Sequence, residues 1–144
     1  MYLDTAILLK LFVREPDSEF FGKLVNGQSI SSSALALTEI FSALLGKERG
    51  GAITSTQRQR AWSAFQYNVD EELIELTPIS PSILRRANRI LERCHPSVAL
   101  RSLDALHLAT CDQLQDWPLY TTDKRMRQAA DVMGFPLNEM PSAD

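Results

Sequence analysis

The sequence predicts a single α/β domain in which helices cover a parallel β-sheet. Two observations predict this fold class. Short runs of apolar, strand-favouring residues alternate along the chain with longer segments of helical periodicity, a pattern typical of strands joined by crossover helices. The chain has 144 residues, of which 44% are apolar and 23% charged, and this is the size and composition of one globular domain.

In the first half of the chain, local signals delimit the predicted elements. Residues 2–3 end a short strand, and residues 5–13 are apolar with helical spacing. Pro16 begins a helix that Asn26 and Gly27 end, because proline suits the first helical turn and glycine the end of a helix. The remaining elements are a strand at 29–32, a helix from 35 to 50–51 and a polar helix at 54–68.

The second half of the chain continues the alternation of strands and helices. Pro81 stands in the first turn of one predicted helix, and Ser102 is the expected N-cap of the next. The elements are strands at 73–76, 119–121 and 135–137, and helices at 81–94, 102–115 and 123–133. We therefore expect about five strands in one domain over residues 1–138, followed by a short tail at 139–144.

Charge and hydropathy narrow the classes of function. The chain has 15 Lys and Arg against 18 Asp and Glu, a net charge of −3, so any contact with nucleic acid must be local. No apolar run reaches the roughly 18–20 residues that cross a bilayer. Asp4 stands where a signal peptide would need basic and then apolar residues. We expect a soluble, cytoplasmic protein that does not bind a membrane.

Four acidic residues lie in unusual settings. Asp4 directly follows the first strand, at the edge where open parallel sheets bind ligands. Glu39 lies inside a nearly uncharged helix, where a glutamate is seldom buried without a partner. Asp104 follows a helix start, and Asp123 lies between the fourth strand and the next helix. Simpler explanations exist, because the three aspartates also suit helix caps or first turns and the glutamate could face solvent.

If the four acids converge at one edge of the sheet, they need a cation. Carboxylates that share a cleft repel one another and raise one another's pKa. Mg²⁺ and Mn²⁺ prefer carboxylate and water oxygens, and Mg²⁺ commonly bridges substrate phosphates. The reaction class inferred from such a site is metal-assisted hydrolysis of a phosphodiester.

Four motifs follow one another along the chain: YLDT at the N-terminus, LTEI inside the apolar helix, SLDALHLA, and TTDKRMRQAADVMGF near the end. Together, in this order and at this chain length, they resemble the PIN-domain family and, more narrowly, the VapC ribonuclease toxins of toxin–antitoxin pairs. The match covers essentially the whole chain. The first strand is unusually short and the tail at 139–144 is unmatched, but neither departure touches the four acids.

The resemblance implies a three-layer α/β/α fold and a Mg²⁺- or Mn²⁺-dependent endoribonuclease. It assigns the metal-binding and catalytic positions to Asp4, Glu39, Asp104 and Asp123. It assigns supporting hydroxyls to Thr5 and Thr121. His107 falls at a position that is frequently His in the family, without an assigned chemical role. The partners it implies are an RNA substrate, a cognate VapB-type antitoxin whose C-terminal segment blocks the acidic cleft, and a second copy in a homodimer.

Three interpretations stay open. The arginines of the helix at 81–94 either face solvent or form a local basic patch for RNA phosphates; they are Arg85, Arg86, Arg89 and Arg93. Apolar side chains near the N-terminus either pack in the core or line a groove for the antitoxin; they are Ile7, Leu8, Leu11, Phe12, Phe20 and Phe21. The alternative to an enzyme is a non-catalytic PIN-like binding module acting through a protein or nucleic-acid partner, whose signature would be the loss of one or more of the acids.

Overall fold

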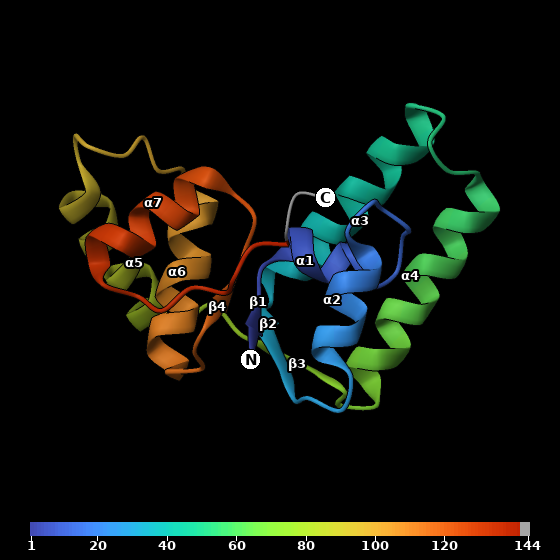
Figure 1. The fold of residues 1–144 in the computed structure, drawn as a ribbon, viewed down its shortest axis with the longest axis horizontal. Helices are drawn as coiled ribbons and strands as arrows, with labels where there is room; N and C mark the ends of the chain where they lie inside the picture. Colours follow the sequence, from blue (N-terminus) through green and yellow to red (C-terminus); the bar gives the residue numbers. More distant parts are fainter. Residues whose placement is uncertain (142–144) are drawn as a thin grey trace.

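The computed structural model describes residues 1–141 and has a parallel sheet between two layers of helices (Figure 1). Within these residues the strands are β1 (Tyr2–Leu3), β2 (Ile30–Ser33), β3 (Ile74–Thr77) and β4 (Leu119–Tyr120). All neighbouring strands pair in parallel, in the order β3-β2-β1-β4. The predicted strand at 135–137 contributes one parallel bridge, between Leu119 and Leu137. The sheet is therefore the expected parallel one, with four strands and a single bridge at its edge.

The helices of the described residues are α1 (Thr5–Lys10), α2 (Ser18–Val25), α3 (Leu35–Arg49), α4 (Ser55–Asp70), α5 (Pro81–Cys94), α6 (Ser102–Leu114) and α7 (Lys124–Met133). The predicted helix at 5–13 ends early, because the backbone N–H groups of Leu11 and Phe12 bond to carbonyls three residues back and tighten the chain into a turn. Ser102 is the first residue of α6, and the N-cap position belongs to Arg101. No helix within residues 1–141 is long and apolar enough to cross a membrane.

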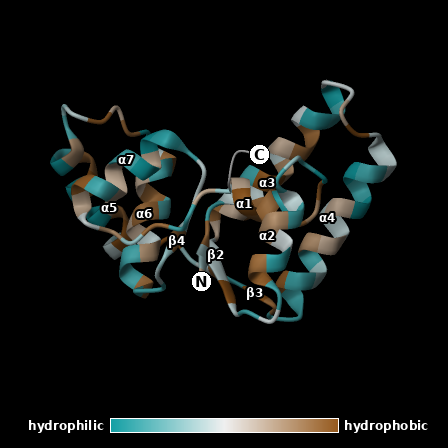
Figure 2. Ribbon diagram, in the orientation of Figure 1, coloured by the Kyte–Doolittle hydropathy of each residue, from teal (hydrophilic) through white to brown (hydrophobic). Residues whose placement is uncertain are grey.

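The two layers of helices bury separate apolar cores against the two faces of the sheet. Successive residues of a strand point to opposite faces, so Tyr2 packs with α5, α6 and α7 while Leu3 packs with α1, α3 and α4. Figure 1 shows this division, with α5–α7 on one side of the strands and α1–α4 on the other. The outer helix α4 carries many of the hydrophilic residues in Figure 2, as expected for a helix that covers a core with one face. This arrangement is the expected three-layer α/β/α fold.

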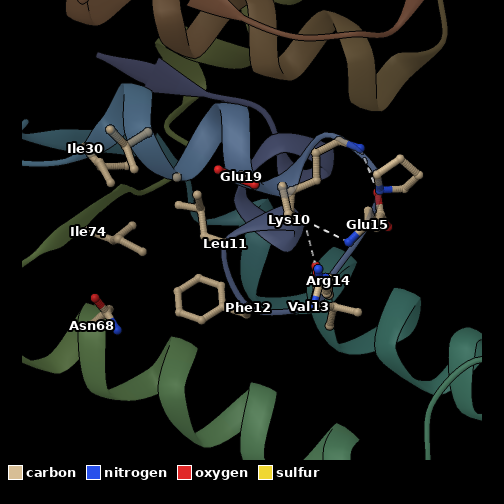
Figure 3. A pocket seen from close by; sticks show the side chains of 14 residues that line it. Lys10, Leu11, Phe12, Val13, Arg14, Glu15, Glu19, Ile30, Asn68 and Ile74 are labelled. Atoms are coloured by element: carbon tan, nitrogen blue, oxygen red, sulfur yellow. Dashed lines mark hydrogen bonds and ion pairs between the residues drawn. The ribbon is translucent and has the colours of Figure 1, made fainter. Parts of the chain in front are cut away.

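An ion-pair network fixes the loop between α1 and α2. Lys10 Nζ lies 2.6 Å from Glu15 Oε2 and 2.7 Å from Asp17 Oδ1, and its side chain is only 11% exposed. Lys47 of α3 reaches the other oxygen of Glu15, at 2.7 Å. Figure 3 shows Lys10 and Glu15 facing each other beside the pocket that this loop borders. Burial raises the pKa of the Glu15 carboxyl, but the hydrogen bonds from the two lysines outweigh it and hold the pKa below its usual value.

We therefore expect Glu15→Gln to destabilise the protein at neutral pH by about 1.5–3 kcal/mol, the range for hydrogen bonds to charged groups. Because the folded-state pKa is lowered, the stabilisation is present above the unfolded pKa of about 4.3 and is lost as the pH falls through the folded value. Urea unfolding at neutral pH and at a series of lower pH values measures the difference between wild type and variant, which should shrink as the pH falls below the unfolded pKa. Glu19→Gln is the matched control, because Glu19 pairs with Lys23 on the exposed surface and its loss should change little. An equal effect of both substitutions would contradict a special role for the Lys10 network.

Candidate active site

The pairing of β1 with β4 brings the first and last candidate residues together. Tyr2 and Leu3 pair in register with the two residues of β4, and the backbone N–H of Asp4 continues the ladder by donating to Tyr120 O at 3.0 Å. Thr121 and Asp123 follow directly after β4. Both chain segments thus leave the sheet at the carboxyl ends of adjacent parallel strands, which is the edge where open α/β sheets bind ligands.

Three of the four acids also serve the N-termini of helices. Asp4 Oδ1 accepts a hydrogen bond from the N–H of Ile7 at 2.8 Å, and Asp123 Oδ1 accepts one from the N–H of Met126 at 2.9 Å. Asp104 stands in the first turn of α6 and accepts from the backbone N–H of Arg101 at 3.4 Å. The helix dipoles favour negative charge at these positions. The cap explanation is therefore correct for these aspartates, and it orients them toward the same edge of the sheet.

Glu39 comes from α3 and is held by two side chains from other elements. Thr5 Oγ1 donates to Glu39 Oε1 at 2.9 Å, and His107 Nε2 lies 2.7 Å from the same oxygen. The other ring nitrogen, His107 Nδ1, lies 2.8 Å from the Tyr2 hydroxyl. A neutral ring satisfies both contacts when Nε2–H donates to the carboxylate and Nδ1 accepts from the hydroxyl. Burial raises the pKa of Tyr2 well above its ordinary value, which keeps this hydroxyl protonated as a donor.

The structure brings the four acids to one pocket of about 130 Å³. Its lining side chains are Asp4, Thr5, Ala6, Glu39, Arg101, Asp104, His107, Asp123 and Met126. Among these, Arg101 is the one permanently charged cation, against four carboxylates. The pocket is therefore short of positive charge.

The pKa values of two acids reflect this environment. Asp4 is only 3% exposed, and burial raises its pKa, with a smaller contribution from the charge of Asp123. The hydroxyl of Thr121 and the N–H of Ile7 offset part of that increase. Burial also acts to raise the pKa of Glu39, but its contacts with His107 and Thr5 outweigh burial and lower the value. Among the described residues, the other three acids each lie within ion-pair distance of Arg101 or His107, whereas Asp4 has no such contact.

The donor set fits a hard divalent cation in its chemistry. Four carboxylates, one of them buried with a raised pKa, are the oxygen ligands that Mg²⁺ and Mn²⁺ prefer. In their present positions, no three His, Cys, Asp or Glu side chains of residues 1–141 are arranged to hold a metal ion together. Arg101 already contacts the carboxylate oxygens of Asp104 and Asp123. Thr5 and His107 already contact the carboxylate of Glu39. The residues are those that such an ion requires, and side-chain movement within the pocket would be needed for them to share it.

The hydroxyls of Thr5 and Thr121, which we expected to support the site, each make a hydrogen bond with one of the four acidic residues. Thr5 donates to Glu39, as described, and Thr121 Oγ1 accepts from the backbone N–H of Asp123 at 3.0 Å. The position of Thr121 depends on Asn138, whose Oδ1 accepts from its backbone N–H at 3.0 Å. Sequence reasoning overlooked Tyr2, Arg101 and Asn138. For Arg101 a signal existed, since it precedes Asp104 by three residues at a helix start, where the two side chains can meet.

The arginines of α5 do not line the pocket of the four acids. Arg85, Arg89 and Arg93 are exposed, as expected for an outer helix face. The expectation was wrong for Arg86, which is half-buried and pairs through Nη1 with Asp112 of α6. The reason is the close packing of α5 on α6, which draws this one side chain inward.

The apolar residues near the N-terminus divide between core and surface. Ile7, Leu8 and Phe21 are fully buried and belong to the core. Leu11 and Phe12 are half-buried and line a separate pocket of about 750 Å³ between the α1–α2 loop, the strands and α4 (Figure 3). Phe20 is partly exposed on α2 and does not line that pocket.

Comparison with known proteins agrees with the fold and with the motifs. A family model described as PIN domain matches residues 1–132, which include all four acids. Ribonuclease VapC46 of Mycobacterium tuberculosis (strain ATCC 25618 / H37Rv) is 34% identical over 138 residues, covering 94% of this chain and 93% of the relative. Ribonuclease VapC35 of Mycobacterium tuberculosis (strain CDC 1551 / Oshkosh) is 30% identical over 147 residues, with the same coverage.

Solved structures share the fold at lower sequence identity. FitAcB from Neisseria gonorrhoeae superposes with a TM-score of 0.69 at 14% identity, covering 96% of both chains. A toxin–antitoxin complex from Klebsiella pneumoniae gives 0.55 at 22% identity, covering 86% of this chain and 88% of that one. These two likenesses concern the fold alone. The family model and the curated relatives confirm the resemblance: the chain belongs to the PIN-domain family and, within it, groups with the VapC ribonucleases.

Proposed function

We propose that this protein is a Mg²⁺- or Mn²⁺-dependent endoribonuclease that acts as the toxin of a toxin–antitoxin pair, on RNA in the cytoplasm. One observation carries the proposal. Carboxylates from four separate chain segments line a single small pocket in which one arginine is the sole permanent positive charge. Buried carboxylates are retained when they are paired or bind a metal, so an acid pocket of this kind favours a cation-binding site over four unrelated caps. The names of the VapC relatives support RNA as the substrate.

In this proposal Asp4, Glu39, Asp104 and Asp123 would hold the ion. The bound ion would supply positive charge for a substrate phosphate and make a water molecule a stronger nucleophile. The other residues of the pocket would hold these acids in place. Thr5 and His107 orient Glu39, and Thr121 orients the backbone at Asp123. Exposed arginines on α5 offer further contacts to RNA phosphates; they are Arg85, Arg89 and Arg93.

The purified chain should cleave single-stranded RNA in the presence of Mg²⁺ or Mn²⁺, and EDTA should stop the cleavage. Asp4→Asn should lower the rate by about 100-fold or more, by analogy with the loss of one charge-stabilising group from a preorganised site. Gel analysis of a labelled RNA measures both effects. Asp131→Asn is the matched control, because Asp131 is an exposed acid of α7 outside the pocket and its loss should leave the rate unchanged.

Full cleavage in EDTA would contradict the metal mechanism, and full cleavage by Asp4→Asn would contradict the assigned site. A folded wild-type protein that binds RNA but never cuts it, whatever the metal, would favour the non-catalytic binding module. Thermal melts of each variant separate loss of activity from loss of fold.

For the antitoxin, we propose docking at the pocket of Figure 3. It has about 750 Å³ and apolar walls from Leu11, Phe12, Val13, Ile30 and Ile74. This pocket lies at the C-terminal end of α1, whereas Asp4 caps the N-terminal end of the same helix. With six residues, α1 is only about 9 Å long, so one partner segment could reach both places. A VapB-type antitoxin and a homodimer are the assemblies that the family suggests.

Expression of the chain alone should arrest growth, and co-expression of the protein encoded by the adjacent reading frame should relieve the arrest. Leu11→Glu should weaken that relief without lowering the RNA cleavage rate, because it places a charge in the apolar pocket and leaves the acid pocket unchanged. Glu19→Gln, a conservative change at the rim of the same pocket, should leave the relief intact. Unimpaired growth at verified expression, or relief that Leu11→Glu leaves unchanged, would contradict this assignment.

A further inference from the structure

Arg101 bridges two acids that come from different helices. Its Nε donates to Asp104 Oδ2 at 2.8 Å, and its Nη2 donates to Asp104 Oδ1 at 3.2 Å. The same Nη2 lies 3.2 Å from Asp123 Oδ2. The guanidinium therefore engages both oxygens of one carboxylate and one oxygen of the other, in the forked geometry that suits arginine.

These contacts leave little room for a second cation at the same oxygens. Both oxygens of Asp104 face the guanidinium, and Asp123 Oδ1 already accepts from the backbone N–H of Met126. An ion that approaches either acid must share oxygens with Arg101 or displace it. Two positive charges within a few ångströms repel, even at an effective dielectric constant of about 20.

The surroundings of Arg101 permit such a displacement. Its side chain is 59% exposed, whereas that of Asp104 is only 10% exposed. The buried carboxylate needs a positive partner, but the arginine can turn into solvent without leaving a buried charge behind. Arg101 therefore pairs with Asp104 and Asp123 while much of its own side chain stays in contact with solvent.

We propose that Arg101 is an exchangeable internal cation of the acid pocket, which neutralises Asp104 and Asp123 and must release them when a divalent ion binds. The inference rests on the proposed function, since it assumes that these acids bind such an ion. Its consequence is that Arg101 stabilises the protein without metal and weakens the affinity for metal. A purely structural ion pair would have the first effect alone.

The experiment measures Mn²⁺ binding and stability, and it requires no RNA cleavage. The electron paramagnetic resonance signal of free Mn²⁺ gives the Kd, and thermal melts with EDTA or Mn²⁺ give the stability. Arg101→Gln should bind Mn²⁺ about tenfold or more tightly than wild type, because a repelling charge is gone. It should melt at a lower temperature in EDTA, and its Tm should rise more on addition of Mn²⁺.

Three comparison variants sharpen the result. Arg101→Lys keeps the positive charge and should stay close to the wild-type Kd, and it serves as the folded variant if the glutamine protein is unstable. Arg125→Gln removes an exposed charge of α7 that does not line the pocket, so it should change neither quantity. Asp4→Asn should weaken Mn²⁺ binding and so locate the ion in the pocket.

An unchanged Kd in Arg101→Gln would overturn the exchange and leave the proposed metal site standing. An equal loss of Tm with EDTA and with Mn²⁺ would also overturn it, because that is the behaviour of a purely structural pair. No Mn²⁺ binding by wild type, or binding that Asp4→Asn leaves unchanged, would instead contradict the proposed metal site and the exchange with it.

Discussion

The parallel register between β1 and β4 is the constraint on which the acid pocket depends. Tyr2 pairs with Leu119 and Leu3 with Tyr120, and this register aligns Asp4 with the segment that carries Asp123. Each strand has only two residues, so few ladder hydrogen bonds define the alignment. The two apolar cores enforce it, because a slip of one residue would turn Tyr2 and Leu3 to the wrong faces of the sheet. Packing on both sides of the sheet therefore positions the acids as much as the sheet itself does.

Helix capping and the proposed catalysis both require the aspartate carboxylates to lie at the N-terminal ends of helices. A cap needs a short side chain whose oxygen points at the first helical N–H groups, and this places the carboxylate at the helix end. Because α1, α6 and α7 all begin at the carboxyl edge of the sheet, the N-cap acids Asp4 and Asp123 and the first-turn acid Asp104 converge. Asparagine caps a helix about as well as aspartate. An Asp→Asn change at these positions thus removes charge while it preserves much of the local structure.

A buried polar chain joins the two helical layers through the sheet. It runs from Tyr2 of β1 through His107 of α6 to Glu39 of α3, and Thr5 of α1 donates to the same carboxylate. Each group has a hydrogen-bond partner, so the chain avoids the cost of unsatisfied polar atoms in a low-dielectric interior. It also orders His107, for which the motif alone indicates no role. The position of Glu39 consequently depends on three other elements, although Glu39 itself lies on a regular helix.

The sequence by itself determined the parallel α/β class and the order of the elements, and it singled out the four acids that line one pocket. It could do so because periodicity, caps and strand ends are local signals that neighbouring residues carry. It also allowed the correct family to be identified. The tertiary structure alone decided which side chains meet: Arg101 between two acids, Tyr2 on His107, and Arg86 against α6 rather than in solvent. It also reduced the predicted strand at 135–137 to one bridge. The physical reason is that these contacts join residues distant in the chain or on different elements, and they form only when helices pack at a particular depth and angle on the sheet, which local patterns do not encode.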